Sequence, residues 1–565
     1  MRNLTLLTDL YQLTMLNGYF EKNIHEDIVV FDMFFRKNAC NGGYTIVCGI
    51  EQFVEYIDNI HFSEDDLAYL KSLNLFSDDF LTFLKDFKFT GDIYAVEEGT
   101  IMFPNEPILT VKAPLYQAQL IETALLTIIN FQSLIATKAS RVCFAAQGDP
   151  VFEFGLRRAQ GPDAGTYGAR AAVIGGCSAT ANVLAGKMFD IPVVGTQAHS
   201  WIQKFDTEIE AFKAYADIYP DKCLLLVDTY NVLNSGLPNA IEVFKDLREK
   251  GHTPLGIRLD SGDLKYLSNQ CKDALDKEGF SNISITASND LDEYTIASLK
   301  ADGAAINSWG VGTKLITSSE SPSLGGVYKL AASFKDGEFE PKIKLSEDPE
   351  KISNPGYKKV FRIYNEENKA EADLIMLHNE SIDESKPLTL FHPVETWKEH
   401  EVENFHAEEL LIPIVEHGKL VYEFPPLMEV QEFSKAQLSK FWEEYLRLDM
   451  PQVYKVDLSE KLHTLKTNMI NDIREGKRKE EKMAKAEKKE KQAGVLKGHW
   501  LWGALVLCIL LLIDLGTKIA AEVYFDILGN SKVVLIPGVI EFTYTENPGM
   551  AFSIGADASP TVKIA

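Results

Sequence analysis

Short apolar runs alternate with helical stretches between residues 150 and 332 of the chain. Seven such runs lie about 20–40 residues apart, and several of them end in polar residues. They cover residues 151–163, 192–200, 223–231, 254–263, 283–291, 304–313 and 326–332. Because parallel strands need long crossover connections, which are usually helical, this alternation predicts repeated β–α units and a parallel sheet.

Two of the segments between these runs carry the boundary signals of helices. The segment "TEIEAFKAYADIY" (207–219) opens with Thr207-x-x-Glu210, the pattern of a capping box, and stops before Pro220. The segment "PNAIEVFKDLREKG" (238–251) begins with proline and ends with glycine, which is the usual asymmetry of helix ends. Both segments are therefore predicted to be helices.

The polar residues at the strand ends favour a closed barrel over an open doubly wound sheet, because the loops at the carboxyl face of a barrel build one shared site. Seven strands are fewer than the usual eight, so the expected fold class is α/β, with an irregular parallel barrel over residues 131–390. The stretch "GDIYAVEEGTIMFPNEPILTVKAP" (91–114) contains short strands and turns and predicts a mixed α/β domain over residues 1–130. Residues 391–474 are expected to pack on that domain.

The composition changes sharply near residue 475. The stretch "EGKRKEEKMAKAEKKEKQ" (475–492) consists almost entirely of Lys, Glu, Ala and Gln. Such a sequence buries no core and predicts a solvated helix or linker over residues 475–497. An apolar region, residues 498–565, follows it.

The overall charge narrows the class of function. The formal net charge is −25 over 565 residues, which excludes a general nucleic-acid-binding protein because phosphate contacts need a basic surface. A local basic pocket for a small phosphate ligand is still compatible with this balance. The seven cysteines form no CxxC pair, and the N-terminus "MRNLTLLTDLYQLTM" has no secretory signal pattern. Reduced thiols and a cytoplasmic location are expected, with membrane association only through residues 499–525.

The most informative strand end is "RLDSGD" (258–263), which places Arg258, Asp260 and Asp263 around a Ser-Gly turn. An arginine beside paired acids suits a ribose hydroxyl pair or a magnesium-bound diphosphate. The structural alternative is a salt bridge together with a helix N-cap, formed by Ser261 or Asp263.

Two further strand ends carry weaker signals. In "SWGVGTK" (308–314), Gly310 and Gly312 allow backbone N–H groups to approach a phosphate, although any tight strand–helix turn has a similar sequence. In "FGLRRAQG" (154–161), Arg157 and Arg158 are suited to a carboxylate or phosphate, or they are a pair of surface arginines. "VDTYN" (227–231) and "SNDL" (288–291) add strand-end acids.

One histidine, His199 in "VVGTQAHSWIQKF" (193–205), follows an apolar run. A lone histidine in that position is more often a core residue with a satisfied hydrogen bond than a catalytic group. The arginines, acids and glycine turn at the other strand ends together fit an anionic, phosphorylated substrate with a divalent metal. The sequence contains no GxxxxGK[ST], HExxH or GxSxG motif.

Over about residues 1–470 the chain resembles the nicotinate phosphoribosyltransferases. The motifs that carry the resemblance are "LLTDLYQLTM", "EGTIMFPNEPIL", "ETALLTIINFQSLIATKASRV", "EFGLRRAQGPDAG", "GTQAHSW", "DTYN", "RLDSGD" and "GVGT". The resemblance implies an irregular α/β barrel with an N-terminal α/β domain. It also implies a reaction that joins nicotinate to 5-phosphoribosyl-1-diphosphate, giving nicotinate mononucleotide and diphosphate for NAD synthesis.

The same resemblance implies ATP hydrolysis coupled through a phosphorylated histidine, which by similarity is His199. Arg258 and Asp260 complete the expected catalytic set. The expected cofactors are ATP and Mg²⁺, with the metal ligands left open, and the expected assembly is a homodimer.

The resemblance also implies a substrate-binding set. Tyr11, which a partner subunit could supply, and Phe154 would sandwich the pyridine ring, while Arg157 would join Arg258 and Asp260 in holding the nicotinate carboxylate, diphosphate and ribose. Gly310 and Gly312 with Thr313 would cradle the 5-phosphate, and Thr196, Ser261 and Gly262 complete the expected substrate-binding residues.

Other functions are compatible with the same residues. A phosphoribosyltransferase for nicotinamide or quinolinate is one alternative, and the quinolinate enzyme would need more basic residues at the pyridine end. A membrane-tethered scaffold, with the C-terminal tail as its functional part, is an alternative of a different class.

The C-terminal tail contains the most apolar segment of the chain, "HWLWGALVLCILLLIDLGTK" (499–518). Its unbroken run from Trp500 to Ile513 is shorter than the roughly 20 residues of a spanning helix. Counted through "DLGTKIAAEVYF", it would span a membrane with Asp514 as a costly internal acid. A buried core helix is the alternative.

The tail also resembles the start of a lipoprotein signal peptidase, a membrane aspartyl protease. The elements "DxxTK" and "N-x-G-x-AFS" carry this resemblance. The catalytic aspartates of that family lie in later membrane helices, beyond the segment present here. Residues 498–565 are therefore expected to be a truncated fragment without peptidase activity, joined to the first part by read-through or a frameshift between neighbouring genes.

Overall fold

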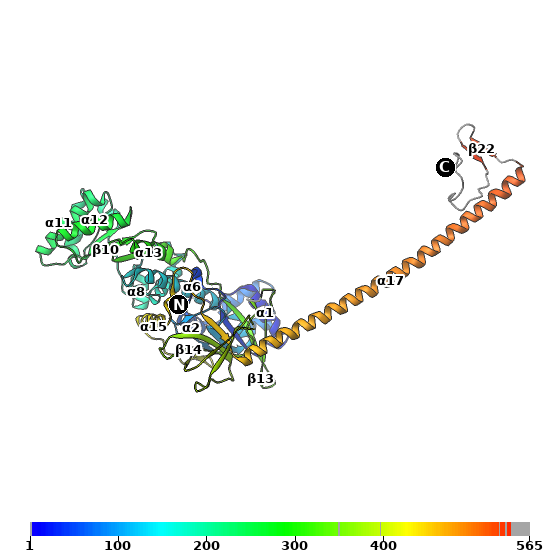
Figure 1. The fold of residues 1–565 in the computed structure, drawn as a ribbon, viewed down its shortest axis with the longest axis horizontal. Coiled ribbons are helices and arrows are strands. Elements are labelled where there is room, and N and C mark those ends of the chain that lie inside the picture. The colour runs from blue at the N-terminus through cyan, green and yellow to red at the C-terminus, as the bar shows by residue number, and fades with distance from the viewer. Residues whose placement is uncertain (1–2, 349–350, 396, 530–531, 537–539, 544–565) are drawn as a thin grey trace. The chain divides into compact units, whose positions relative to one another are not determined.

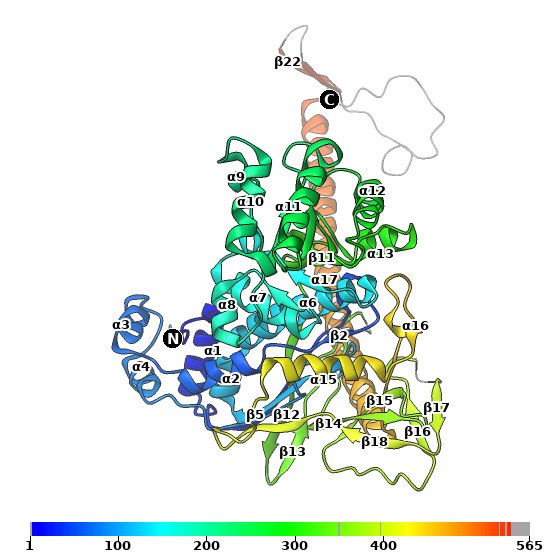
Figure 2. The ribbon, with the colours of Figure 1, turned by 90° about the vertical axis from the view of Figure 1, so that its left-hand side faces the viewer.

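The computed structural model describes residues 3–348, 351–395, 397–529, 532–536 and 540–543. Its contacts divide the chain into two units, residues 1–470 and residues 471–565. Helix α17 (Glu460–Leu528) runs through the boundary between them. The first unit holds three large sheets (Figures 1 and 2).

The first large sheet has seven strands in the spatial order β13-β12-β1-β5-β3-β19-β20. Its strands are β1 (Ile28–Phe34), β3 (Asp92–Ala95), β5 (Leu109–Pro114), β12 (Val327–Lys335), β13 (Glu338–Pro341), β19 (Ile412–Glu416) and β20 (Lys419–Leu420). The expected strands within 91–114 are confirmed as β3, β5 and the short β4 (Ile101–Met102), which pairs with β2 (Thr45–Ile46). The N-terminal helices are α1 (Leu10–Glu21), α2 (Ile50–Asn59), α3 (Glu64–Ser72), α4 (Asp78–Lys85) and α5 (Leu115–Leu120).

The second large sheet is parallel and has the order β7-β6-β11-β10-β9-β8. Its strands are β6 (Val151–Glu153), β7 (Ala179–Thr180), β8 (Leu224–Leu226), β9 (Gly256–Leu259), β10 (Ser284–Ser288) and β11 (Ser308–Val311). The last strand, β11, pairs with the first, β6. The order therefore follows the chain around a ring, with a gap between β7 and β8.

The segment after β7 lies in this gap. Thr180 and Val193 form an isolated parallel bridge, and the Thr196 hydroxyl donates to the Leu224 carbonyl of β8 at 3.1 Å. These contacts and the ring order are those of an irregular barrel, although closure of the barrel stays a prediction.

Two of the seven predicted strands need correction. Residues 192–200 form no named strand, because Pro192 has no N–H for a ladder and helix α9 (His199–Gln203) begins inside the run. Of the predicted strand 326–332, residues 327–332 lie in β12, which pairs antiparallel with β1 in the first sheet rather than with the parallel strands. Alternation of apolar residues predicted this strand but does not specify its partner.

The helices of the parallel sheet begin and end where local signals place them. The helix predicted over 207–219 is α10 (Glu208–Ile218), with the Thr207–Glu210 capping box formed in both directions. The helix predicted over 238–251 is α11 (Leu237–Glu249), with proline in its first turn. The others are α6 (Glu122–Ala146), α7 (Pro162–Ile174), α8 (Val183–Phe189), α12 (Leu264–Lys277), α13 (Glu293–Ala301) and α14 (Thr313–Ile316).

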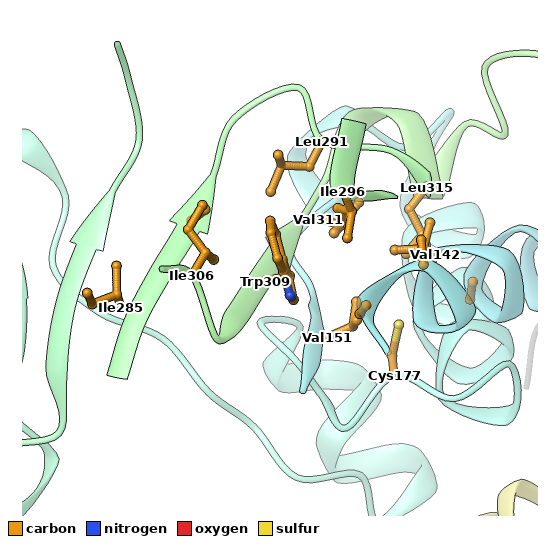
Figure 3. Packing of buried hydrophobic residues seen from close by; sticks show 14 of the residues in the cluster. Val142, Val151, Cys177, Ile285, Leu291, Ile296, Ile306, Trp309, Val311 and Leu315 are labelled. Carbon is orange, nitrogen blue, oxygen red and sulfur yellow. The ribbon is translucent and has the colours of Figure 1, made fainter. Parts of the chain in front are cut away.

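The core between these helices and the sheet centres on Trp309 of β11, which is fully buried. Figure 3 shows Trp309 between Ile306 and Val151, with Leu291 and Val311 nearby. Its indole N–H donates to Asp149 at 3.0 Å. This satisfied hydrogen bond and the surrounding apolar side chains fix the position of β11 immediately before Gly310.

The third sheet contains strands from both sides of residue 390, the expected end of the barrel region. Its order is β17-β16-β21-β15-β14-β18. The strands are β14 (Lys358–Tyr364), β15 (Ala370–Leu377), β16 (Leu388–Phe391), β17 (Glu399–Val402), β18 (His406–Glu409) and β21 (Lys455–Leu458), and helices α15 (Leu427–Ser439) and α16 (Glu443–Leu446) lie between β20 and β21 in the chain.

The second unit, among its described residues, contains most of α17 and a hairpin of β22 (Lys532–Ile536) and β23 (Ile540–Thr543). The charged stretch 475–492 is helical, which is one of the two forms predicted for it, a helix or a linker. The "N-x-G-x-AFS" element of the second resemblance lies outside the described residues.

Candidate active site

Polar and aromatic side chains gather at the carboxyl ends of the parallel strands. Because these strands all run in the same direction, the residues that follow each of them meet at one edge of the sheet. Phe154 follows β6, His199 lies at the start of α9, Asp228 and Thr229 follow β8, Asp260 and Ser261 follow β9, Ser288 ends β10, and Gly310 lies within β11.

Arg258, Asp260 and Ser288 form the centre of this edge. Arg258 donates from Nη2 to Asp260 Oδ1 at 2.8 Å and from Nε to Ser288 Oγ at 2.8 Å. The Ser288 hydroxyl in turn donates to the same Asp260 oxygen. The three side chains hold one another in place and leave Asp260 Oδ2 free of these bonds.

Burial alone would raise the pKa of the Asp260 carboxyl, but the Ser288 hydrogen bond and the Arg258 charge outweigh it. The pKa of Asp260 therefore lies below its ordinary value. The carboxylate is ionised at neutral pH and carries a full negative charge at the strand end.

Asp228 braces the loop that carries Asp260. Its Oδ2 accepts the backbone N–H of Asp260 at 2.9 Å and the hydroxyl of Ser261 at 2.6 Å. Its other oxygen, Oδ1, is buried and has no hydrogen-bond partner among the described residues. A buried carboxylate oxygen without a partner is costly, so it marks a place where a donor or cation would be stabilised.

His199 faces the same cluster. Its Nδ1 lies 3.1 Å from Thr229 Oγ1, and its Nε2 lies 3.8 Å from Asp260 Oδ2. The side chain is 41% exposed, so His199 is not a core histidine. In the tautomer whose Nδ1–H donates to the Thr229 hydroxyl, Nε2 carries the lone pair. This lone pair faces the site, with the Asp260 carboxylate beside it.

Phe154 supplies an apolar wall. The Arg258 guanidinium carbon lies 5.9 Å from the centre of its ring, and the Phe154 N–H donates to Val311 at 2.8 Å. A Cβ on Gly310 would lie 2.7 Å from two ring atoms of Phe154. Glycine at this position is therefore required by the closeness of the aromatic ring.

The chain is similar to proteins of one family over most of its length. Family models of nicotinate phosphoribosyltransferase match residues 6–130 (N-terminal domain), 150–364 (nicotinate phosphoribosyltransferase family) and 357–466 (C-terminal domain). The nicotinate phosphoribosyltransferase of Bacillus subtilis is 47% identical over 473 residues, which cover 84% of this chain and 96% of that protein. The chain belongs to the nicotinate phosphoribosyltransferase family.

Other relatives agree with this membership. The nicotinate phosphoribosyltransferase of Caenorhabditis elegans is 37% identical over 519 residues, covering 81% of this chain and 92% of that protein. The crystal structure of human nicotinic acid phosphoribosyltransferase superposes with a TM-score of 0.73 at 30% identity, covering 82% of this chain and 99% of that one. The family thus accounts for the first unit, and its models end at residue 466.

Several residues expected from the family resemblance do lie together. His199, Arg258, Asp260, Ser261 and Phe154 belong to the connected cluster described above. Gly310 packs on Phe154, and a Cβ on Gly312 would lie 3.2 Å from the Phe154 carbonyl oxygen. Thr313 begins α14 directly after Gly312 and is exposed. Gly262 follows Ser261 with a φ of +83°, a conformation that favours glycine.

Asp263 has the structural role that the sequence left open. Its side chain accepts the Tyr266 N–H at 3.0 Å and caps the N-terminus of α12. Ser261 does not cap this helix, because its hydroxyl is bonded to Asp228. The salt bridge and the helix N-cap expected for this motif are both present, but in different residues. Asp263 caps the helix, and Arg258 and Asp260 form the salt bridge within the site.

Three expected substrate contacts lie less centrally. Arg157 lies with Arg158 in the exposed turn Leu156–Arg158 that follows Phe154. Thr196 bonds to β8 and to Gln197. Tyr11 of α1 is 48% exposed, and among the described residues it makes no hydrogen bond or ring contact with the cluster.

Sequence reasoning did not single out Asp228, Thr229 and Ser288 as individuals. The motifs "VDTYN" and "SNDL" did mark their strand ends as polar. The decisive signal is three-dimensional: each of the three bonds to His199, Asp260 or Arg258 across about 30 residues of sequence.

Proposed function

We propose that the chain joins nicotinate to 5-phosphoribosyl-1-diphosphate and releases nicotinate mononucleotide and diphosphate in NAD biosynthesis. The observation that carries this proposal is the hydrogen-bonded Arg258–Asp260–Ser288 cluster at the strand ends of a member of this family. Displacement at the anomeric carbon passes through an oxocarbenium-like state, so alignment and charge neutralisation suffice and no protein nucleophile toward the sugar is needed.

Different residues of the site suit different parts of the two substrates. Phe154 offers a flat apolar face for the pyridine ring, with Arg258 and the exposed Arg157 available for its carboxylate and for diphosphate. Asp260 suits ribose hydroxyls as an acceptor, and Ser261, whose own proton is donated to Asp228, offers a second acceptor oxygen. The turn at Gly310 and Gly312, followed by Thr313, leaves room for the 5-phosphate beside the backbone.

The acids of the site fit a magnesium ion. Mg²⁺ prefers carboxylate oxygens and usually retains several waters, and Asp228 has a buried Oδ1 without a partner. We infer that Asp228 and Asp260 would hold the ion, directly or through water. When bound, Mg²⁺ neutralises charge on the departing diphosphate.

We propose that His199 accepts the γ-phosphoryl group of ATP. Nε2 would attack the γ-phosphorus as the bond to ADP breaks, and ADP would leave with the bonding electrons. Thr229 would hold the ring through Nδ1, and the Asp260 carboxylate would stabilise the positive imidazolium. Hydrolysis of the phosphohistidine by water would then return the free histidine and phosphate.

A homodimer would complete the pyridine site. Tyr11 is exposed, and among the described residues it makes no ring contact with Phe154 of its own chain. We propose that Tyr11 of a second copy stacks on the other face of the pyridine ring. We also propose that the catalytic unit acts in the cytoplasm.

A product assay tests the reaction. The full chain is incubated with 5-phosphoribosyl-1-diphosphate, Mg²⁺ and one of nicotinate, nicotinamide or quinolinate, with and without ATP. We expect mononucleotide from nicotinate and a higher rate with ATP. Preferential product from nicotinamide or quinolinate would instead assign one of the alternative substrates.

The His199→Ala variant tests the coupling. It should lose all stimulation by ATP and all incorporation of label from γ-³²P-ATP, while its circular dichroism and melting temperature stay unchanged. His252→Ala is the matched control and should retain full stimulation, because among the described residues the His252 side chain pairs with the exposed Asp221 alone. Stimulation that persists in His199→Ala would refute the assignment.

A further inference from the structure

The apolar part of α17 is exposed on every side. The segment Trp502–Tyr524 has 23 residues, a mean hydropathy of 2.2 and no buried share among its described residues. Five consecutive residues, Ile509 to Ile513, are each 48–69% exposed. At 3.6 residues per turn they cover the whole circumference of the helix. An apolar surface of this kind has no single face for a folded partner.

The length of the segment matches a bilayer. At about 1.5 Å per residue, 23 residues extend about 35 Å, which exceeds the roughly 30 Å hydrocarbon core. Trp502 and Tyr524 lie at its two ends, where amphipathic aromatic rings are typical of membrane–water interfaces.

Two of the three charged residues inside the segment pair with each other, and the third, Glu522, lies two residues from the end of the segment. Lys518 Nζ lies 2.7 Å from Asp514 Oδ2, one helical turn away. The Thr517 hydroxyl donates to the Asp514 carbonyl oxygen at 2.9 Å. A charged side chain in a membrane is costly when it is alone, and pairing within the helix reduces that cost. Asp514 therefore does not oppose insertion as strongly as its charge suggests.

The charges on the two sides of the segment differ. Residues 477–497 contain nine Lys or Arg and four Asp or Glu, whereas residues 525–543 contain a single basic residue, Lys532. Lys and Arg next to a membrane helix favour the cytoplasmic side and are attracted to anionic lipids. This asymmetry gives the segment a preferred direction.

We propose that Trp502–Tyr524 spans a lipid bilayer containing anionic lipids and anchors the catalytic unit on its cytoplasmic face. The inference is independent of the chemistry proposed for His199. A coiled coil of two copies is disfavoured, because it needs one apolar stripe on each helix and would leave the remaining apolar faces in water.

Flotation of the full chain tests insertion. The chain is produced in bacteria, and membranes are washed with high salt and floated through a sucrose gradient. We expect the protein to float with the membranes and to be released only by detergent. Aggregated protein stays at the bottom of the gradient, and a chain found there or in the soluble fraction would overturn the proposal.

Two lysines introduced in the middle of Trp502–Tyr524 test whether this segment is what holds the chain in the membrane. The double variant Leu510→Lys with Leu512→Lys should lower the floating fraction at least about tenfold and still form nicotinate mononucleotide at the parental rate. The matched control places two lysines at exposed positions of the first unit, Tyr69→Lys with Leu75→Lys, and should float like the parent. Equal flotation of the two double variants would refute the proposal. Activity is scored separately, so an inactive but membrane-bound chain would count against the proposed function alone.

A cysteine on each side of the segment tests orientation. Gly529→Cys should react with a membrane-impermeant maleimide added outside intact spheroplasts, and Asp65→Cys on the first unit should react only after lysis. The parent chain, with its own exposed Cys508, gives the background. The reverse pattern, or labelling of both sites only after lysis, would overturn the proposed topology.

Discussion

Two clusters of the first unit each contain an arginine paired with an aspartate, and they differ in whether a ligand can reach the pair. At the strand ends, Arg258 pairs with Asp260, and their side chains are 14% and 28% exposed. In the third sheet, Arg362 pairs with Asp373, and both side chains are fully buried. The exposed pair has His199 and the unpartnered Asp228 Oδ1 beside it. The buried pair is hydrogen-bonded except at Arg362 Nη1, which has no partner among the described residues but is closed off from any ligand.

The buried pair is a structural group. Arg362 donates to Asp373 from Nε at 2.8 Å and from Nη2 at 2.6 Å, and its Nη2 also donates to the Ile101 carbonyl. Tyr454 donates its hydroxyl to the same aspartate at 3.1 Å. An arginine–carboxylate pair therefore indicates function only where a ligand can reach it. Four predictions test this distinction.

The largest effect is expected from the buried pair. Arg362→Ala leaves the Asp373 charge unpaired in the core and should lower the free energy of unfolding by about 3–5 kcal/mol. Urea denaturation followed by tryptophan fluorescence measures it. Replacing both partners, Arg362→Met with Asp373→Leu, should cost clearly less. If the double variant is as unstable as the single one, the unpaired Asp373 charge is not the cause of the loss, and the prediction is wrong.

The Arg258→Ala variant should show the opposite pattern. Because Arg258 stands at the substrate edge, kcat/KM for nicotinate mononucleotide formation should fall about 10²–10³-fold, or about 3–4 kcal/mol. The free energy of unfolding should change by about 1 kcal/mol or less, since the pair is partly exposed. A loss of stability as large as that of Arg362→Ala would remove the distinction between the two clusters.

Gly310→Ala should have an intermediate effect. The new methyl group would lie 2.7 Å from the Phe154 ring and displace the ring, which should raise KM for nicotinate about tenfold, or about 1.4 kcal/mol. The double variant Gly310→Ala with Phe154→Leu should show a coupling energy different from zero in a double-mutant cycle. Strict additivity would show that the glycine acts independently of the ring.

The smallest effect concerns stability at acid pH. The pKa of Asp260 is lower in the folded protein than in the unfolded chain, so its stabilising contribution is present above the usual aspartate pKa of about 3.9 and is lost as pH falls through the lower folded value. Asp260→Asn should therefore be less stable than the parent at neutral pH, and the difference should disappear toward acid. A difference that grows as pH falls would contradict the sign of the shift.

The comparison also explains how far the site could be predicted from the sequence. Arg258, Asp260 and Asp263 occur within six residues, yet only the first two face the site, because Asp263 caps α12. His199 had no local mark of function, and its contacts with Thr229 and Asp260 come from other strand ends. Ser288 was visible only as part of a polar strand end.

By itself the sequence determined the elements whose signals are local. The capping box at Thr207, the proline in the first turn of α11 and the apolar runs of β8 to β11 depend on residues a few positions apart. The tertiary structure decided which strands pair and which side chains meet. It placed β12 beside β1 instead of in the parallel sheet, and it brought Asp228, Asp260 and His199 together. The physical reason is that strand partners and site contacts depend on packing between distant segments, which no local periodicity encodes.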